Sequence, residues 1–466
     1  MNRRNFLLTA GVLALPKARA AGQSVRLTVR PDLPLQTISP DFMGLGYEIA
    51  SVARPGLLSG SNTAYAQFVR TLGARGVIRI GGNTADFAKY SPSAAPVSSP
   101  FGTVVNQAVL NDLGSFLKAT GWRLIWALDL GKGTEAEAID EARAIIAIAG
   151  DKLLGFEIGN EPDLFGRAKH RQPEYAFEDW LAEYRRYKAA LRAQFPRIPF
   201  AGPDVAGKTN WVTRFAADEG KDCVLLTHHY YREGQNPAST IEKLLAPDPK
   251  LQPQLDELSR ASTTSGIPYR ICEVNSFSGG GRPGVSDTMA AALWALDYMF
   301  TLAAGGCAGV NMETGVNHRD FISSYSPIGD DEHGRYSAKP EYYGMLAFSL
   351  AATGRMLTVE MNPGLPEMKA YATQTRQGSL AVTLINKGSA PIDIECHAPG
   401  RHASAVRLTG PTIDSKTGVT LGGAEVDAAG VWKPRPEVLR VRNGEFSLTL
   451  PAFSAAIVSN YRGRIG

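Results

Sequence analysis

Two glutamates in this sequence are candidates for a pair of catalytic carboxyl groups. Glu161 follows an apolar segment and stands between Asn160 and Pro162, and Glu273 ends another apolar segment. Hydrolysis of a glycosidic bond needs one group that protonates the departing oxygen and a second that attacks the anomeric carbon or activates water. When the two groups are close, the negative charge of one raises the pKa of the other. Asn160 could hydrogen-bond the sugar 2-hydroxyl beside them.

The elements that would hold this pair follow from an alternation of short apolar and longer amphipathic segments between residues 41 and 345. Strands are expected over residues 42–47, 77–81, 123–129, 153–159, 199–203, 224–229, 269–274 and 309–313. Helices are expected over residues 65–72, 109–118, 134–149, 178–194, 254–265 and 285–304. Eight strands with intervening helices predict an α/β fold, a (β/α)8 TIM barrel with right-handed crossovers.

This barrel would bring the two glutamates together. Glu161 follows the fourth expected strand and Glu273 ends the seventh, and they lie 112 residues apart. That interval is about three strand–helix units of the barrel. Both side chains are therefore expected at the C-terminal mouth of the barrel, where enzymes of this fold place their catalytic residues.

A second domain is predicted after residue 352, where the helical period disappears. Residues 368–373, 380–386, 392–397, 405–408 and 446–458 alternate apolar and polar side chains between Gly, Pro and Asn turns. This pattern predicts an antiparallel β-sandwich, and residues 25–29 share the pattern, so that an N-terminal strand would join it. We expect a catalytic barrel over residues 41–345 and a sandwich domain over residues 24–40 plus 346–466.

The first 20 residues resemble an export signal. Arg3 and Arg4 precede an apolar stretch at residues 7–15, and Ala18 and Ala20 form an A-x-A cleavage site. Paired arginines of this kind resemble a bacterial twin-arginine leader, which predicts export to the periplasm or out of the cell. The alternative, a lipid-facing N-terminal helix, is disfavoured by the short apolar core.

Charge and hydropathy limit the classes of partner. The predicted leader contains four of the 49 Lys and Arg residues and no acid, which leaves 45 basic against 45 acidic side chains. The net charge is then near zero and does not indicate a nucleic-acid partner. No uncharged apolar run of 18 or more residues is found, so no membrane-spanning helix is expected. The oligomeric state is not indicated.

The cysteines and histidines do not indicate a metal or cofactor site. Cys223, Cys272, Cys307 and Cys396 form no C-x-x-C pair, and buried free thiols are expected in preference to disulfides. Adjacent residues on a strand face opposite sides, so His228 and His229 could not easily bind one metal ion. We therefore expect neither a metal nor a cofactor.

Further motifs accompany the two glutamates. They are Arg79-Ile-Gly-Gly-Asn-Thr84, His228-His-Tyr-Tyr231, Glu273-Val-Asn-Ser-Phe-Ser-Gly-Gly-Gly281 and Gly284-Val-Ser-Asp-Thr288. Together they resemble family 79 of the glycoside hydrolases, the bacterial β-glucuronidases and heparanases, from about residue 25 to the C-terminus. The resemblance implies a barrel with a sandwich built from both chain ends. It also implies retaining hydrolysis of β-glucuronic acid linkages in glycans, with heparan sulfate among the candidate substrates.

The resemblance also implies a role for individual residues. Glu161 would be the general acid/base and Glu273 the nucleophile. The backbone N–H groups of Gly279 and Gly280 would bind the uronate carboxylate, with a tyrosine, here Tyr325, completing that site. The remaining implied contacts are Glu48 with the outer sugar hydroxyls, Asn83 in support of Glu48, and Tyr230 with the nucleophile. Turn glycines and ordinary polar residues at the barrel mouth are the alternative interpretation of these positions.

Two other functions remain open, as does the mode of attack. The same two glutamates could serve a related glycosidase that acts on a neutral sugar such as xylose or glucose. The chain could also be a glycan-binding protein without activity. The Pro- and Ser-rich residues 87–105 decide between two modes: if they wall off the cleft, terminal uronate is removed, and if they lie flat, internal bonds are accessible. No long excised linker interrupts this region, so a single uncleaved chain is expected.

Overall fold

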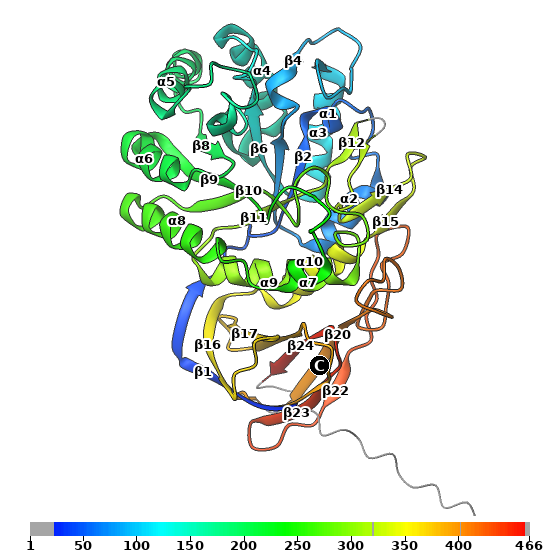
Figure 1. The fold of residues 1–466 in the computed structure, drawn as a ribbon. Coiled ribbons are helices and arrows are strands. Elements are labelled where there is room, and N and C mark those ends of the chain that lie inside the picture. The colour runs from blue at the N-terminus through cyan, green and yellow to red at the C-terminus, as the bar shows by residue number, and fades with distance from the viewer. Residues whose placement is uncertain (1–22, 319–320, 401, 462–466) are drawn as a thin grey trace, which may run out of the picture.

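The computed structural model describes residues 23–318, 321–400 and 402–461, which form a barrel above a curled β-sheet (Figure 1). Eight parallel strands close the barrel in the order β10-β11-β2-β3-β6-β7-β8-β9, which confirms the predicted TIM barrel. Their bounds are β2 (Gly44–Glu48), β3 (Val77–Gly81), β6 (Arg123–Leu128), β7 (Leu153–Ile158), β8 (Phe200–Val205), β9 (Cys223–Tyr231), β10 (Tyr269–Asn275) and β11 (Val310–Glu313). Each begins and ends within about two residues of its predicted place, because buried parallel strands are short apolar runs.

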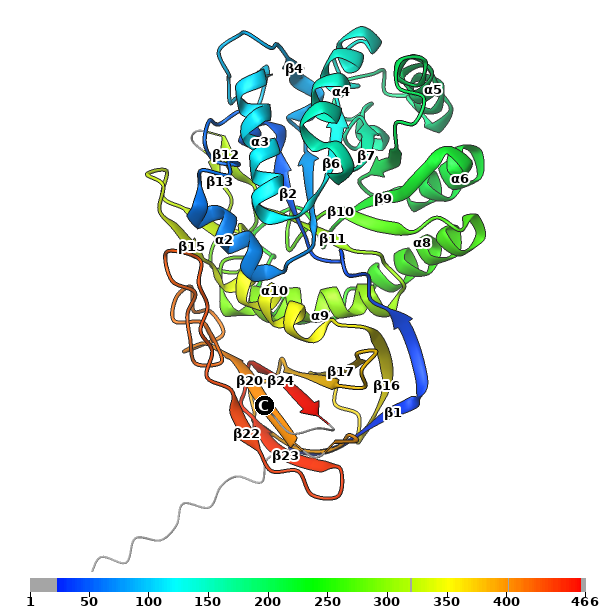
Figure 2. The ribbon, with the colours of Figure 1, turned by 180° about the vertical axis from the view of Figure 1, so that it is seen from behind.

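Helices cover the outside of the barrel (Figures 1 and 2). They are α2 (Thr63–Leu72), α3 (Gln107–Thr120), α4 (Glu135–Ala149), α5 (Phe177–Gln194), α6 (Thr209–Glu219), α8 (Leu251–Ser265), α9 (Met289–Ala304) and α10 (Pro340–Ala351), with the short helices α1 (Ile49–Val52) and α7 (Ile241–Leu245). Neither α6 nor α10 is predicted from the sequence. The N-terminus of α6 has no side-chain cap to mark it. Helix α10 is buried on almost every side, so its apolar residues show no 3.6-residue period.

Helices α9 and α10 lie between the barrel and the lower sheet (Figure 1). They pack against one another, and α10 also contacts strands of the sheet. Because α10 crosses the predicted domain boundary near residue 345, the division of the chain at that point stays a prediction.

The lower domain is one ten-stranded sheet rather than two separate layers. Its main order is β21-β20-β24-β18-β17-β16-β1-β19-β23, and β22 pairs with β20. The bounds are β1 (Gln23–Thr37), β16 (Arg355–Asn362), β17 (Met368–Gln374), β18 (Leu380–Asn386), β19 (Ile392–His397), β20 (His402–Thr409), β21 (Thr420–Leu421), β22 (Glu437–Leu439), β23 (Glu445–Leu450) and β24 (Ser454–Tyr461). The sheet curls around its own apolar core. The alternating segment 446–458 forms two of its strands, β23 and β24.

Strand β1 joins the two halves of this sheet, as the predicted N-terminal strand. It runs antiparallel to β16 and parallel to β19. Val25, Leu27 and Val29 point alternately into the core of the lower domain. The pairing of both chain ends in one sheet follows from this alternation, because one face of β1 is apolar and must be buried.

Short strands outside the barrel lie in two loops. The loop between β3 and α3 contains β4 (Ala88–Tyr90) and β5 (Thr103–Val105). The segment after β11 contains β12 (Val316–His318), β13 (Phe321–Ile322), β14 (Ile328–Asp330) and β15 (Tyr336–Ala338). Residues 87–105 are therefore partly structured, and they are available to form a wall of the mouth.

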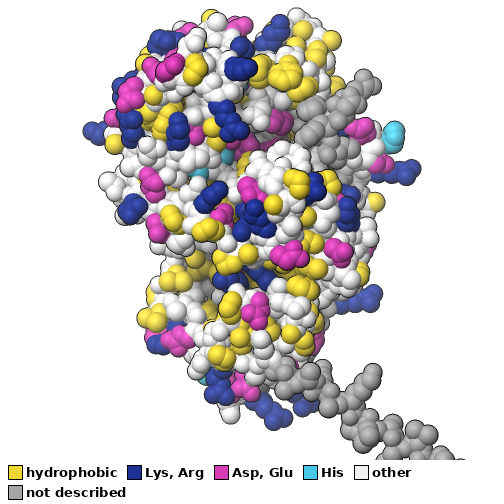
Figure 3. Space-filling model, in the orientation of Figure 1, with side chains coloured by type: hydrophobic (Ala, Val, Ile, Leu, Met, Phe, Trp, Pro, Cys, Tyr) yellow, Lys and Arg dark blue, Asp and Glu magenta, His cyan; other side chains and the backbone are white. Residues whose placement is uncertain are grey.

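Three further expectations concern the surface and the cysteines. The predicted leader, residues 1–20, lies outside the described residues. Of the helices that the structure describes, none has the length and apolar character needed to cross a membrane. All four cysteines are buried and free, which confirms the prediction of thiols. Lys and Arg are interspersed with Asp and Glu on the face shown in Figure 3.

Candidate active site

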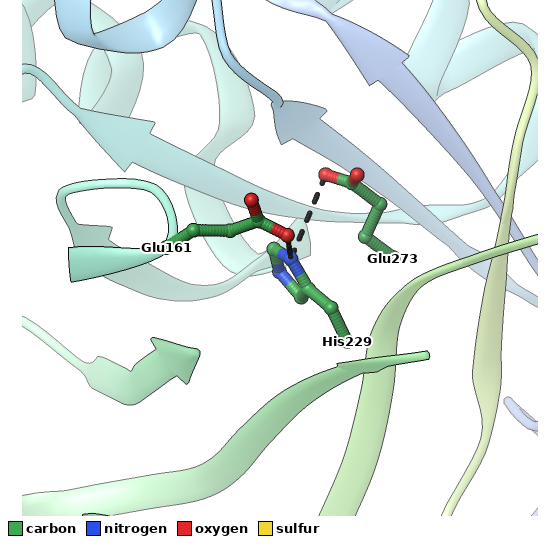
Figure 4. A group of neighbouring side chains, drawn as sticks. All are labelled: Glu161, His229 and Glu273. Atoms are coloured by element: carbon green, nitrogen blue, oxygen red, sulfur yellow. Dashed lines mark hydrogen bonds and ion pairs between the residues drawn. The ribbon is translucent and has the colours of Figure 1, made fainter. Parts of the chain in front are cut away.

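The structure brings Glu161 and Glu273 together at the C-terminal mouth of the barrel, with His229 between them (Figure 4). The Nδ1 atom of His229 lies 3.0 Å from Oε1 of Glu161 and 3.8 Å from Oε2 of Glu273. One oxygen of each carboxyl group and one ring nitrogen all lie within 4.8 Å of one another. Two carboxyl groups this close can both reach the same atom of a bound ligand.

The backbone at Glu161 is strained and firmly held. Glu161 has a φ of 50°, in the left-handed region, directly after Gly159 and Asn160. This conformation costs a non-glycine residue about 1–2 kcal/mol. The N–H of Glu161 donates to the carbonyl of Asp204 at 2.9 Å, and its carbonyl accepts from the N–H of Leu164 at 2.8 Å. These bonds hold the side chain over the barrel mouth, and such strain is typical of functional positions.

Arg79 on β3 lies completely buried beneath the two glutamates. Its guanidinium donates to Oε2 of Glu273 at 2.9 Å and to Oδ1 of Asn160 at 2.9 Å. It also donates to Glu157 and Asp204. Because Oδ1 of Asn160 is occupied in this way, its Nδ2 is the atom left to reach a sugar hydroxyl. Burial opposes the charge of Arg79, but the surrounding carboxylates raise its pKa well above the usual value.

His229 is a second cation in the same network. Its Nε2 lies 2.6 Å from Oδ1 of Asp204, and its Nδ1 faces Glu161. Burial favours the neutral ring, but the charges of Asp204 and Glu273 outweigh burial and raise the pKa of His229 well above its usual value. Burial likewise opposes the charge of Asp204, and Arg79 and His229 hold its pKa below the ordinary range. Both ring nitrogens of His229 face carboxyl oxygens, so the trio of Figure 4 forms one hydrogen-bonded network with Asp204.

The two glutamates have unequal environments. Glu273 receives hydrogen bonds from Arg79 and from the hydroxyl of Tyr231, at 2.9 and 3.0 Å, which stabilise a carboxylate. For Glu161, burial and the charge of Glu273 raise the pKa, and the hydrogen bond and charge of His229 oppose them in part. Burial thus favours a proton on Glu161, while two hydrogen-bond donors face Glu273, which suits an acid beside a nucleophile.

A cleft of about 530 Å³ opens above these groups. Seven of the predicted site residues line it: Glu48, Asn83, Glu161, Glu273, Gly279, Gly280 and Tyr325. Asn160 lies buried beside them, held by Arg79. The structure thus collects eight of the nine predicted site residues from six loops and strands.

Glu48 is oriented by the turn after β3. Its carboxylate accepts from the N–H and hydroxyl of Thr84, at 2.8 and 2.6 Å, and from the N–H of Asn83 at 3.2 Å. The support expected from Asn83 is therefore made by its backbone, and Thr84 contributes more. Gly82 makes the close approach possible, because a Cβ atom there would lie 2.4 Å from the Glu48 carboxyl carbon.

The glycine turn after β10 faces the same cleft. Gly279 and Gly280 have φ values of 79° and 86°, which only glycine adopts readily. The carbonyl of Gly280 accepts from Ser324, next to Tyr325, at 2.7 Å, which ties the turn to the loop after β13. Tyr325 stacks against Tyr231 with ring centroids 6.3 Å apart. The turn and the tyrosine thus border one end of the cleft.

The prediction for Tyr230 is wrong. Its hydroxyl donates to Asp248 at 2.7 Å, and its ring stacks on Tyr298 in a separate cavity between the barrel and the lower domain. Tyr231 instead contacts Glu273, the predicted nucleophile. Successive side chains of a strand face opposite sides, so a one-residue difference moves the hydroxyl from the cleft to the outside. Tyr231 shares the parity of His229, which is the signal that could have identified it.

Six residues of the network were not among the predicted site residues. They are Arg79, Thr84, Glu157, Asp204, His229 and Tyr231. A signal existed for Arg79, because a single arginine inside an apolar strand needs internal partners. No comparable signal marks Asp204. Its importance comes only from its contacts with Arg79 and His229, which form when β8 packs into the barrel.

The two adjacent tyrosines provide a matched test of the network. Tyr231→Phe removes a hydrogen bond to the Glu273 carboxylate and is expected to lower kcat/KM by about 10- to 100-fold. Tyr230→Phe should stay within about twofold of the wild type, because its hydroxyl faces Asp248. Steady-state kinetics on an aryl β-glucuronide measures both. A larger loss for Tyr230→Phe than for Tyr231→Phe would contradict this assignment.

Comparison with known proteins finds glycosidases that are similar in sequence to this chain. No model of a known protein family matches the chain. A β-glucuronidase of Aspergillus niger is 28% identical over 385 residues, which cover 74% of this chain and 69% of that protein. A mouse heparanase is 22% identical over 422 residues, 76% of each chain. These relatives are fungal and mammalian, so they give no support to the bacterial origin that the resemblance implied.

A solved structure shares the fold. The 4-O-α-L-rhamnosyl-β-D-glucuronidase of Fusarium oxysporum superposes with a TM-score of 0.77 at 19% identity. The match covers 93% of this chain and all of that one. At this identity the likeness establishes the barrel and the accompanying sheet, which agree with the architecture described above.

Proposed function

We propose that this chain is a retaining glycoside hydrolase of the same type as the β-glucuronidases and heparanases to which it is related, and that it cleaves β-glucuronic acid linkages in glycans. One observation carries this proposal: two carboxyl groups in unequal surroundings have oxygens within 4.8 Å of each other in an open cleft. Inverting enzymes keep their carboxyl groups roughly 6.5–9.5 Å apart to admit a water, and retaining enzymes do not.

In this mechanism each glutamate has one role at each step. Glu161 donates its proton to the departing oxygen while a carboxylate oxygen of Glu273 attacks the anomeric carbon, so that a covalent glycosyl-enzyme forms. Glu161, now a carboxylate, takes a proton from water, which then releases the sugar. Arg79 and Tyr231 hold Glu273 in place, and His229 orients Glu161.

The rest of the cleft fits a uronic acid. We assign the N–H groups of Gly279 and Gly280, with the hydroxyl of Tyr325, to the carboxylate of the sugar. Consecutive amides of a glycine turn form a nest for anions. Glu48 would accept hydrogen bonds from the outer hydroxyls, supported by the backbone of Asn83. Asn160 would donate Nδ2 to the 2-hydroxyl, a contact that strengthens in the transition state.

The loop after β3 forms one wall of the cleft, which supports the removal of terminal sugars. Phe87, Pro100 and Phe101 line the cleft. Phe87 and Phe101 pack edge to face with ring centroids 5.2 Å apart, and the Phe101 side chain is 73% exposed. We propose that this aromatic wall limits the cleft to the end of a glycan chain.

We also propose that the predicted leader exports the enzyme, to the periplasm or beyond the cell. A twin-arginine leader carries proteins that have already folded. This route suits a chain whose four cysteines are buried and free, because folding would precede exposure to an oxidising environment. A polymeric glycan outside the cytoplasm would then be accessible.

The proposed function is tested with three substrates of the wild-type enzyme. An aryl β-glucuronide should exceed the matching β-glucoside in kcat/KM by about 10³- to 10⁵-fold, because polar groups built for a carboxylate are left unpaired by a neutral sugar. Heparan sulfate should release terminal uronate without a fall in chain length. Equal rates on the two aryl substrates would favour the neutral-sugar enzyme, and rapid chain shortening would establish internal cleavage.

A further inference from the structure

The cleft carries an excess of acidic groups for a site that takes an anion. Five carboxyl side chains line it, from Glu48, Glu161, Glu233, Glu273 and Glu313, and no Lys or Arg belongs to its lining within the described residues. Arg79 lies underneath, and its donors are occupied by the groups around it. A uronate adds another negative charge. Its binding therefore requires that some of these carboxyl groups remain uncharged.

Glu313 is the group whose surroundings are least suited to a charge. It ends β11 and is only 2% exposed. Its Oε1 accepts from the N–H of Gly315 at 3.1 Å, while its Oε2 is buried and has no partner among the described groups. Gly46 makes room for Oε2, because a Cβ atom there would lie 2.5 Å away. Burial of a carboxylate with one neutral donor and no paired cation costs much more free energy than burial of the neutral acid.

The groups around Glu313 add to this preference. Those that face it or connect to it are Tyr47 and Glu48 on β2, Arg79 on β3, Tyr231 on β9, Glu273 on β10, Tyr325 after β13, and Glu341 on α10 through Asn275. Burial, followed by the charges of Glu273 and Glu48, raises the pKa of Glu313 well above its usual value, and Arg79 opposes this only in part. Glu313 also lies close enough to raise the pKa of Tyr325, after burial of that ring.

We propose that Glu313 controls, in a pH-dependent way, whether the cleft binds an anionic sugar. As a neutral acid, Glu313 allows the uronate carboxylate to bind beside Tyr325. Once Glu313 is ionised, its negative charge excludes the uronate. This inference deepens the proposed function and rests on it. The sign follows from the direction of the shift. Glu313 is uncharged at low pH and gains its charge as the pH rises through the raised pKa, so uronate affinity is lost toward high pH.

The wild-type enzyme provides the first test. KM is measured against pH for an aryl β-glucuronide and for its uncharged methyl ester. We expect KM of the acid to rise with pH, approaching about tenfold per pH unit once Glu313 ionises, while KM of the ester stays flat. Deprotonation of Glu161 lowers kcat for both substrates alike. The effect of Glu161 therefore appears in kcat, and the effect of Glu313 appears in KM for the acid alone.

Two variants provide the matched comparison. Glu313→Gln stays neutral at every pH, so its KM for the glucuronide should lose the rise at high pH. Glu233→Gln is the control, because Glu233 lines the same cleft but is paired with Lys243 at 2.7 Å. The hydrogen bond from Lys243 holds the pKa of Glu233 below its usual range. Replacing Glu233 should change KM by a constant factor and leave its slope against pH unaltered.

Several results would overturn the assignment. Parallel KM profiles for the acid and the ester would do so, as would a Glu313→Gln variant that keeps the wild-type slope. If Glu313→Gln fails to fold, as judged by thermal unfolding, the comparison of acid and ester in the wild type decides alone. Normal glucuronide turnover with parallel profiles would reject only the role of Glu313, whereas absent turnover of both substrates would reject the proposed function itself.

Discussion

Glu273→Gln is expected to lower kcat by about 10⁵- to 10⁶-fold on every glucuronide, because no other carboxylate can form the bond to the anomeric carbon. The structure supports this size of effect, since Glu273 alone combines hydrogen bonds from Arg79 and Tyr231 with a place on the cleft. The accompanying measurement is a covalent trap. A 2-fluoro-glucuronide with a good leaving group should leave one adduct, which peptide mass spectrometry places on Glu273.

The control for this experiment is Glu233→Gln, which removes a carboxylate from the same cleft whose hydrogen bonds come from Ser239 and Lys243. It should retain activity within about tenfold, because its main partner is a partly exposed lysine. An adduct on Glu161, or a product of inverted configuration by NMR, would contradict the assigned roles. Absence of any adduct with a folded, substrate-binding protein would favour the glycan-binding alternative.

Glu161→Ala is expected to have an effect that depends on the leaving group. For a glucuronide with a poor leaving group, kcat should fall by about 10³- to 10⁴-fold, because general acid catalysis is lost. For an activated aryl glucuronide the first step needs little protonation and the loss should be much smaller. Glu273→Gln should lose activity equally on both substrates. Steady-state rates on the two substrates with the three proteins decide the matter.

The pH profile adds a second readout for Glu161. The acid must carry its proton, and burial with the charge of Glu273 raises its pKa. On the poor substrate, kcat of the wild type should therefore fall as the pH rises through this raised pKa. In Glu161→Ala this high-pH limb should vanish. Equal losses on good and poor leaving groups, or an unchanged limb, would assign the proton donor to another residue.

Much of the fold could be predicted because its signals are local. Strand β3 occupies residues 77–81 as predicted, and the other barrel strands shift by about two residues at most. Buried parallel strands are short apolar runs, and amphipathic helices separate them. Each element can therefore be recognised from the hydrophobic pattern of its own residues. The alternation in residues 25–29 likewise predicted that β1 would join the lower sheet. Helix α10 was not predicted, because a helix that is buried on almost every side has apolar residues all round and shows no 3.6-residue hydrophobic period.

The candidate site was predictable only where a motif stood at a strand end. Glu161 and Glu273 could be paired because strand number sets position around a closed barrel. The contact to the nucleophile could not be assigned between Tyr230 and Tyr231, because the registration of β9 against its neighbours decides which one faces inward. For the same reason, the sequence could not show that the His229 side chain faces the mouth of the barrel.

By itself, the order of residues determined the barrel, the inserted N-terminal strand and the two glutamates at its mouth, since these depend on periodicity and on counting strands. Tertiary structure alone decided the surroundings of each carboxyl group. Arg79, Asp204 and His229 come from three strands, and only their meeting gives the two glutamates different hydrogen-bond partners. The buried, unpartnered Oε2 of Glu313 likewise depends on what surrounds it. A pKa is a property of an environment, and that environment forms only when the barrel closes.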